Sequence, residues 1–315
     1  MQHKMILDLD TGIDDALAIA YALGSPEIEL IGITSEYGNV LTERSVVNSQ
    51  QILNLLQHPA VPVYQGAGHA LNQSDFSVLP ISAEIHGQDG VGDIHLQQAV
   101  PTGETESAVD FLLTACQQYG SDLTIVATGP MTNLALAIQK DLPTLQKVGQ
   151  IVIMGGALTV AGNVSPFAEA NINQDPEAAD LLFKSGLPVT MVGLDVTLRT
   201  LFTKADTAEW RAIGTEAAIK YADMVDYYIK AYEVTSPHLQ GCALHDPLAV
   251  AVAIDPSLVT TFPLNLTTET TGPSRGRTIG DNLRLEDLTT RTQVCVQVDT
   301  PRFLNEFKTR IGQLL

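Results

Sequence analysis

The densest group of residues able to do chemistry is the segment Asp8-Leu-Asp10-Thr-Gly-Ile-Asp14-Asp15, in which four aspartates fall within eight residues. Asp8 and Asp10 end an apolar run, and their spacing places them on one face of a strand. Asp14 and Asp15 come where a helix would begin, a position at which the helix dipole favours carboxylates. Converging carboxylates repel one another unless a cation compensates them, and an all-oxygen ligand set suits Ca²⁺ or Mg²⁺. The segment therefore predicts a site for a hard divalent cation.

Polar residues also follow other apolar runs. Asn39 and Thr128 come after two of them. A backbone carbonyl at Thr128 can bind a hard cation. Both positions also have a structural interpretation, since Asn tolerates a left-handed turn and the Thr128 segment can simply connect a strand to a helix. A long irregular segment further on carries three side chains with no evident local structural role, and their groups suit the recognition of sugar hydroxyls: Asn163, Glu169 and Asn171.

The dipeptide His245-Asp246 stands immediately before an apolar helical stretch that begins with Pro247. In one interpretation Asp246 only caps this helix and His245 is a surface residue. In the other, Asp246 is a further oxygen ligand and His245 is a proton donor near neutral pH.

Short β-branched runs alternate with helical ones and supply the elements that must position these residues. Strands are predicted at Met5–Leu9, Ile28–Thr34, Val61–Tyr64, Leu123–Ala127, Gln150–Met154 and Pro188–Val192, and the tail alternates as in β-structure at Leu264–Thr271 and Gln293–Val298. Such alternation indicates an α/β fold with a parallel sheet covered by helices on both faces. Ligands of such sheets bind beyond the carboxyl ends of the strands, where the polar residues above are found.

Composition narrows the classes of function. The chain has 315 residues, with 17 Lys and Arg against 36 Asp and Glu, a net charge of −19. This charge disfavours nucleic acid and membrane-surface partners. No apolar run is long enough for a membrane span, and the first residues do not have the pattern of a signal peptide. Cys116, Cys242 and Cys295 are far apart and odd in number, as expected of reduced thiols in a cytoplasmic protein.

Taken together, these segments resemble the nucleoside hydrolase family, of the inosine-uridine-preferring type. The resemblance covers nearly the whole chain, which we therefore expect to form a single catalytic domain, residues 1–315. It is carried by the Asp cluster, Gly38-Asn39, Ile85-His86-Gly87, Thr128-Gly-Pro, Met154-Gly-Gly, Gly162-Asn163, Asn171-x-x-x-Asp175-Pro176, Val192-Gly-Leu-Asp195 and His245-Asp246-Pro247.

The resemblance implies an open α/β fold with a mainly parallel sheet, one bound Ca²⁺, and assembly as a homodimer or homotetramer. Its metal ligands correspond to Asp10, Asp15, Asp246 and the carbonyl of Thr128. The residues that hold the ribose correspond to Asp14, Asn39, Asn163, Glu169, Asn171 and Asp246. The residues near the base correspond to His86, Tyr228, Tyr232 and His245. Asp10 is implied to accept the proton of the attacking water, and His245 to assist the leaving base. Tyr228 and Tyr232, four apart on a helix, are equally well interpreted as core aromatics.

Two positions depart from the family pattern. Thr11 replaces the usual proline after Asp10, so we expect the turn to keep its course with some loss of rigidity. Ala170 stands where many relatives carry an aromatic residue, which predicts a looser wall of the sugar site.

The predicted function is calcium-dependent hydrolysis of the N-glycosidic bond of ribonucleosides through an oxocarbenium-like transition state. The predicted base is a pyrimidine or inosine. A purine site built on paired Trp stacking is not expected, because Trp210 is the only Trp and lies away from the motifs.

Three alternatives remain at this stage. A Mg²⁺-dependent aspartyl phosphatase of the haloacid-dehalogenase type has a similar opening motif, but with one residue between the second Asp and the Thr. A non-catalytic nucleoside- or calcium-binding protein would keep the same ligands. A nucleoside phosphorylase would need a phosphate cradle, and basic residues are scarce near the motifs.

Overall fold

An eight-stranded sheet forms the centre of the computed structural model, which describes residues 2–99, 104–287 and 292–315. The strand order is β3-β2-β1-β4-β5-β6-β12-β9, and every neighbouring pair is parallel except β12 with β9. The strands are β1 His3–Leu9, β2 Ile28–Ser35, β3 Val63–Gln65, β4 Leu123–Ala127, β5 Gln150–Met154, β6 Val189–Val192, β9 Val259–Pro263 and β12 Gln293–Val298. The predicted mainly parallel α/β fold is confirmed.

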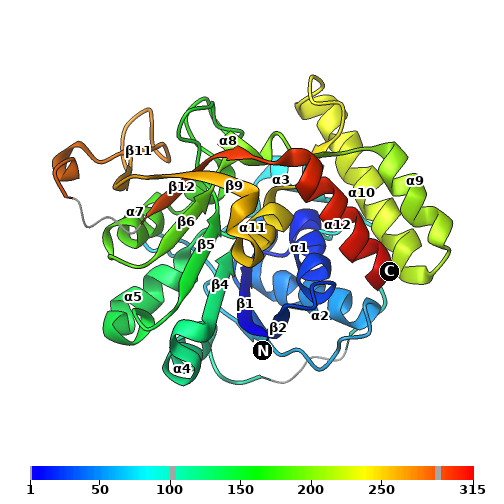
Figure 1. Cartoon of the computed structure of the whole chain (residues 1–315), viewed down its shortest axis with the longest axis horizontal. Helices are drawn as coiled ribbons and strands as arrows, with labels where there is room; N and C mark the ends of the chain where they lie inside the picture. Colours follow the sequence, from blue (N-terminus) through cyan, green and yellow to red (C-terminus); the bar gives the residue numbers. More distant parts are fainter. Residues whose placement is uncertain (1, 100–103, 288–291) are drawn as a thin grey trace.

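Helices cover both faces of this sheet (Figure 1). One face packs against α1 Ile13–Leu23, α2 Thr42–Leu55, α11 His245–Ile254 and α12 Thr300–Leu314, and the other against α4 Ala108–Tyr119, α5 Thr132–Leu145 and α7 Pro176–Lys184. Strand β1 shows how the pattern builds two cores. Met5, Leu7 and Leu9 belong to the core beneath α1, whereas Ile6 belongs to the core beneath α5.

The remaining elements lie around the sheet. Two helices, α9 Lys204–Ile213 and α10 Glu216–Thr235, pack against each other and are separated by Gly214, which has a φ of 83°. Short pairs are formed by β7 Leu201–Phe202 with β8 Cys242–Ala243, and by β10 Leu266–Thr268 with β11 Thr278–Gly280. The short helices are α3 Pro80–His86, α6 Ala170–Gln174 and α8 Leu194–Thr197, and three 3-10 turns span Gly120–Asp122, Pro256–Leu258 and Asn282–Arg284. Within the described part of the chain, no helix combines the length and apolarity required to cross a membrane.

Candidate active site

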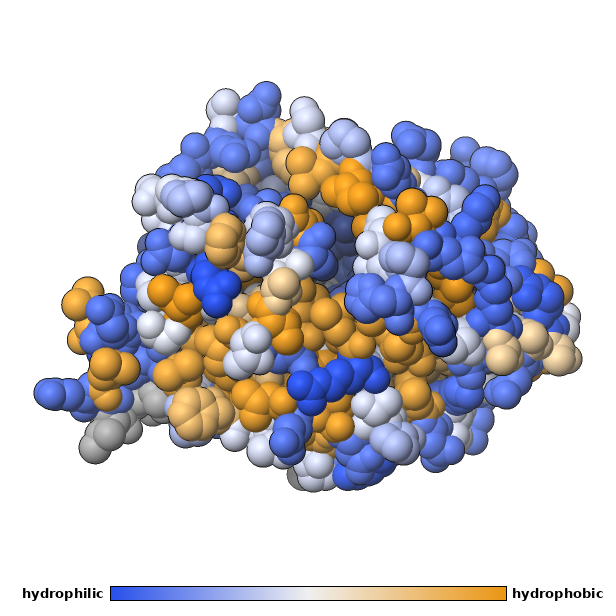
Figure 2. Space-filling model, turned by 90° about the horizontal axis from the view of Figure 1, so that it is seen from above, coloured by the Kyte–Doolittle hydropathy of each residue, from blue (hydrophilic) through white to orange (hydrophobic). Residues whose placement is uncertain are grey.

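The carboxyl ends of the parallel strands surround a cavity of about 430 Å³. Figure 2 shows the molecule from above, looking onto this edge of the sheet, where a recess is visible between hydrophobic and hydrophilic residues. The cavity is lined by all of the residues predicted to bind substrate, namely Asp14, Asn39, His86, Asn163, Glu169, Asn171, Tyr228, Tyr232 and Asp246, together with Thr128 and His245. The structure therefore brings together side chains that are more than two hundred residues apart in sequence.

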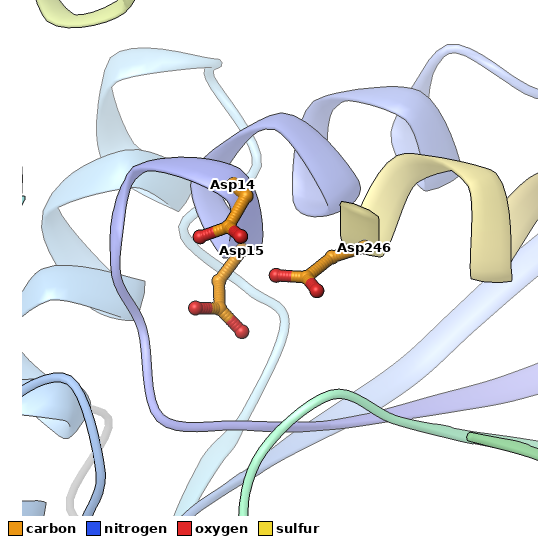
Figure 3. Close-up of side chains that lie close together, drawn as sticks. All are labelled: Asp14, Asp15 and Asp246. Carbon is orange, nitrogen blue, oxygen red and sulfur yellow. The ribbon is translucent and has the colours of Figure 1, made fainter. Parts of the chain in front are cut away.

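Three carboxylates converge at this cavity, and two of them, Asp14 and Asp246, line it. Asp14, Asp15 and Asp246 each offer an oxygen, and these oxygens lie within 4.8 Å of one another. Figure 3 shows the side chain of Asp246, at the start of α11, pointing toward those of Asp14 and Asp15 at the start of α1. Each of the three residues is buried. Asp14, predicted to bind ribose, is therefore also placed to bind a cation, whereas the predicted ligand Asp10 is outside this group.

Local structure holds these carboxylates in place. Helix α1 begins directly after Gly12, whose N–H donates to Asp15 Oδ2 at 2.7 Å. The other oxygen of Asp15 accepts a 2.7 Å hydrogen bond from Thr128 Oγ1, which links the end of β4 to the cluster. Asp246 lies in the first turn of α11 and is carried there by β8. Because α1 packs against α11, the two helix starts meet.

The electrostatics of the cluster favour a bound cation. Burial raises the pKa of Asp14 to about 6, and burial with the nearby Asp14 charge raises the pKa of Asp15 to about 6. Burial and the neighbouring acids raise the pKa of Asp246 further. Asp14 Oδ1 is buried without a hydrogen-bond partner, and its ion-pair contact within the described residues is with His86 Nδ1 at 3.9 Å. Burial lowers the pKa of His86 to about 4, so this ring is neutral at pH 7 and the charge is left uncompensated. The donor set thus fits a hard divalent ion.

Asp10 is not among the residues that line the cavity, but it is bonded to Asn39, which is. Its carboxylate accepts hydrogen bonds from Asn39 N at 2.7 Å and from Asn39 Nδ2 at 3.2 Å. Burial and the charge of Asp15 raise its pKa well above the ordinary value. A carboxyl group with a raised pKa is the kind of group that can act as a general base near neutral pH.

Gly38 is required for this arrangement. Its φ is +155°, and a Cβ atom on it would lie 1.9 Å from Asp10 Oδ2. We expect Gly38→Ala to displace Asp10 and Asn39 and to lower kcat/KM for a ribonucleoside roughly 100-fold, since misplacement by about 1 Å has this effect on reacting groups. Steady-state kinetics measure the loss. Gly214→Ala provides the control, because Gly214 also has a positive φ but has no neighbour near a Cβ and is remote from the cavity. An equal loss in both variants would contradict this explanation.

The ribose side of the cavity corrects one sequence interpretation. The sequence showed no local role for Asn163, Glu169 and Asn171, but each has one. Glu169 caps α6 by accepting from the N–H groups of Asn171 and Ile172. Asn163 Oδ1 accepts from Ala170 N at 3.0 Å, and Asn171 Nδ2 donates to the Thr128 carbonyl at 2.6 Å. These bonds fix the orientation of the groups that face the cavity.

The base side contains a chain of aromatic groups. Tyr232 Oη lies 2.7 Å from His245 Nε2, and Thr197 Oγ1 lies 2.8 Å from His245 Nδ1. Tyr228 donates to Asp14 Oδ2 at 3.2 Å. The two tyrosines therefore face the site, although their spacing fitted a core role equally well. Ile85, from one of the motifs named above, also lines the cavity, and apolar residues that the sequence did not indicate complete the walls, including Ile81, Val160, Leu198 and Leu239.

Thr11 takes a defined place in a polar network. Its hydroxyl lies 2.7 Å from Ser49 Oγ and accepts from Ser45 Oγ at 3.2 Å, and its carbonyl accepts from Asn48 Nδ2 at 3.0 Å. All four residues are fully buried. These bonds from helix α2 restrain the turn at Thr11, where relatives usually have a proline. They therefore offset the loss of rigidity that we expect from the missing proline. Ala170 lines the cavity as a half-buried residue.

The chain is similar to known nucleoside hydrolases and nucleosidases. Residues 5–305 match the family model described as inosine-uridine preferring nucleoside hydrolase. The chain is 35% identical to the pyrimidine-specific ribonucleoside hydrolase RihA of Enterobacter sp. (strain 638), covering 99% of both chains. It is 37% identical to a probable uridine nucleosidase 1 of Oryza sativa subsp. japonica, over 89% of this chain and 85% of the relative.

The solved structures that resemble this chain are also nucleoside hydrolases. The purine-preferring ribonucleoside hydrolase from Gardnerella vaginalis is 59% identical, with a TM-score of 0.97 over 99% of this chain and 98% of that one. A plant nucleoside hydrolase is 33% identical, with a TM-score of 0.93 over 99% of both chains. The phosphatase alternative is therefore wrong. The chain belongs to the inosine-uridine preferring nucleoside hydrolase family, and it is a ribonucleoside hydrolase.

Proposed function

We propose that the protein hydrolyses the N-glycosidic bond of ribonucleosides in a calcium-dependent reaction, giving ribose and free base. The observation that carries this proposal is the convergence of Asp14, Asp15 and Asp246 at a cavity that is lined by the groups predicted to bind ribose. The proposed ligands are Asp10, Asp15, Asp246 and the Thr128 carbonyl, to which the geometry adds Asp14. When bound, Ca²⁺ would keep the surrounding carboxylates ionised and would orient a water and two sugar hydroxyls.

The ribose hydroxyls are assigned to the polar lining of the cavity. Asp14 and Asn39 face the 2′-hydroxyl, which favours ribose over deoxyribose. Asn163, Glu169 and Asn171 hold the remaining hydroxyls, and their local hydrogen bonds reduce the freedom that binding must remove. As the glycosidic bond breaks, positive charge develops on the sugar ring and is stabilised by the ionised carboxylates around it.

The attacking water and the leaving base are each assigned a residue that assists them. Asp10 accepts the proton of the attacking water. Burial lowers the pKa of His245 to about 4, so the free enzyme holds a neutral ring at pH 7. We therefore assign the leaving base a hydrogen bond from the neutral His245–Tyr232 pair, with His86 beside it. A nucleobase leaves poorly as an anion, so this contact is a required part of the proposal.

The role of His245 predicts a dependence on the leaving group. His245→Ala should lower kcat for inosine roughly 10²–10⁴-fold, the usual contribution of a positioned acid. Turnover of 4-nitrophenyl riboside should change little, because nitrophenolate leaves without a proton. Spectrophotometric rates for both substrates provide the measurement. Equal losses on the two substrates would remove His245 from this role.

Bound cation should stabilise the fold in a pH-dependent way. The pKa of Asp14 and Asp15 rises from 3.8 to about 6, so the metal-free fold prefers their protonated forms and loses stability as pH rises through this window. A divalent ion favours the ionised forms. The increase in Tm on adding Ca²⁺ to chelator-treated protein should therefore be larger at about pH 7.5 than at about pH 5. Equal increases at the two pH values would contradict the assignment of these carboxylates.

For the base, we propose that inosine is a preferred substrate. The sequence predicted a pyrimidine or inosine, the 59% identical relative is described as purine-preferring, and relatives at 35–37% identity are described as pyrimidine-specific or as uridine nucleosidases. Trp210 packs against Phe202 and Phe307 away from the cavity, so a paired-Trp stack has no role.

A hydrolysis panel tests the proposal. Chelator-treated protein is assayed on inosine, uridine, cytidine, adenosine and guanosine, with and without added Ca²⁺, and base release is followed by chromatography. We expect release that requires the ion and is highest or near-highest with inosine. Binding without release would indicate a nucleoside-binding protein, and release that requires phosphate would indicate a phosphorylase.

We further propose that residues 1–315 act as one catalytic domain in the cytoplasm and form a homo-oligomer. Ligands drawn from β1 through α11 around one sheet support the single domain. Three buried free cysteines agree with a reducing compartment. Sedimentation of the full chain tests the assembly into dimers or tetramers.

A further inference from the structure

Helix α8 has no part in the reaction as described, although its motif Val192-Gly-Leu-Asp195 contributed to the family resemblance. Its four residues, Leu194–Thr197, are buried and follow β6 at the carboxyl edge of the sheet. Two of them, Asp195 and Thr197, have polar side chains that are almost completely inaccessible to solvent. Their hydrogen bonds run to opposite sides of the cavity.

Asp195 holds the segment 155–169, here called the ribose loop, which carries Asn163 and Glu169. Its carboxylate accepts hydrogen bonds from Leu158 N at 2.9 Å, Thr159 N at 2.7 Å and Thr159 Oγ1 at 2.5 Å. These three donors lie on one turn of the ribose loop. Hydrogen bonds to an ionised acceptor are about twice as strong as neutral ones, so this carboxylate is a strong anchor for the loop.

The backbone reinforces the same contact. Leu194 N donates to the Gly156 carbonyl at 2.9 Å, so the first residue of α8 is joined to the start of the ribose loop. A Cβ on Gly193 would lie 2.7 Å from that carbonyl oxygen, which leaves no room for a larger residue. The position of the ribose loop is therefore set by α8.

Thr197 holds the other side of the cavity. Its hydroxyl lies 2.8 Å from His245 Nδ1, while Nε2 of the same ring contacts Tyr232. Backbone segments next to this bond support it. Leu244 N donates to the Thr200 carbonyl at 2.9 Å, and Thr200 Oγ1 donates to the Thr197 carbonyl at 2.9 Å. One imidazole is thus oriented from both of its nitrogens.

We propose that α8 is a positioning element for both halves of the substrate, in which Asp195 positions the ribose loop and Thr197 orients the His245–Tyr232 pair toward the leaving base. This inference rests on the proposed function. Neither residue lines the cavity, so both act through others. The two roles predict different kinetic consequences, because every riboside needs the sugar contacts but only a poor leaving group needs the contact from His245.

The test compares Asp195→Asn and Thr197→Val on inosine and on 4-nitrophenyl riboside. Asp195→Asn should raise KM about tenfold or more on both substrates, since it loosens contacts made to the sugar. Thr197→Val should lower kcat for inosine about tenfold or more while kcat for the nitrophenyl riboside stays within about twofold, since only the former needs help with the leaving group. Calcium affinity, measured by calorimetry, should stay within about twofold in both variants, because in the described part of the chain no hydrogen bond or ion pair joins α8 to the three clustered carboxylates.

Matched controls separate positioning from general loss of structure. Asp180 accepts from Thr267 Oγ1 and Thr268 N, the same types of donor that Asp195 uses, but on the hairpin β10–β11. Thr207 is a fully buried threonine on α9 whose hydroxyl bonds to Asp226. Asp180→Asn and Thr207→Val should leave kcat and KM unchanged on both substrates. If Asp195→Asn does not fold, Thr159→Val removes one of the three bonds and should raise KM on both substrates by a smaller factor.

Some results would overturn the inference. Equal losses on both substrates in Thr197→Val, or unchanged KM in both Asp195→Asn and Thr159→Val, would show that α8 has only a structural role. Wild-type protein that releases no base from inosine would instead refute the proposed function, before any variant is compared.

Discussion

Replacing Asp10 with asparagine is expected to lower kcat for inosine roughly 10²–10⁴-fold, the contribution of a positioned general base. Asparagine keeps the shape of the side chain and can still accept from Asn39 N, but it cannot take a proton from water. Single-turnover base release at saturating Ca²⁺ gives the chemical step directly. The loss should appear in kcat rather than in KM, because the sugar contacts are made by other residues.

Asp8→Asn is a matched control for this variant. Asp8 shares the face of β1 with Asp10 and is also fully buried, but it bonds to Thr34 and Asn133 away from the cavity. It should therefore retain turnover, with any effect confined to stability. Near-normal hydrolysis by Asp10→Asn, or an equal loss in Asp8→Asn, would show that Asp10 is not the base.

Replacing Asp246 with asparagine should have an effect at least as large, because this residue belongs to both the cation cluster and the sugar site. Loss of one of the four proposed carboxylate donors should weaken Ca²⁺ binding by more than the roughly 10–100-fold that loss of an outer-shell partner causes. Stabilisation by added Ca²⁺, about 2.7 kcal/mol at a hundred times Kd, should disappear at the same concentration. Calorimetry and thermal unfolding measure both effects.

Asp255→Asn is the control for this second variant. Asp255 follows the other end of α11 and pairs with Arg302 outside the cavity. It should bind Ca²⁺ as the wild type does. Unchanged calcium affinity in Asp246→Asn would separate this carboxylate from the cation and leave it with the sugar alone.

The parts of the site that could be predicted are those set by local pattern. The apolar run of β1 ends at Leu9, the first turn of α1 contains Asp14 and Asp15, and the first turn of the apolar helix α11 contains Asp246. In a parallel sheet, such strand ends and helix starts meet at one edge. The predicted boundaries of β4 and β5 also agree with the structure, because fully buried strands read as short continuous apolar runs.

The parts that could not be predicted depend on contacts between distant segments. Helix α3, within a stretch predicted to be irregular, is held by packing against α10 rather than by a periodic apolar face. Strand β9 is an edge strand with mostly exposed residues, so it lacks the alternation that identifies a strand. The bond between Thr197 and His245 joins residues 48 apart.

One interpretation was open to sequence reasoning and was missed. Glu169 stands before the start of α6, where the helix dipole and the free N–H groups of the first turn favour a carboxylate. Its capping role does not conflict with its place in the cavity, because the capping bonds determine where its carboxylate lies.

The most direct test of the central claim is a calcium titration of chelator-treated protein, with metal content and inosine hydrolysis measured on the same samples. The claim is that carboxylates from both ends of the chain hold one ion on which ribonucleoside hydrolysis depends. It predicts negligible base release without metal and recovery that saturates at one Ca²⁺ per chain. Full hydrolysis by protein shown to contain no metal would contradict it.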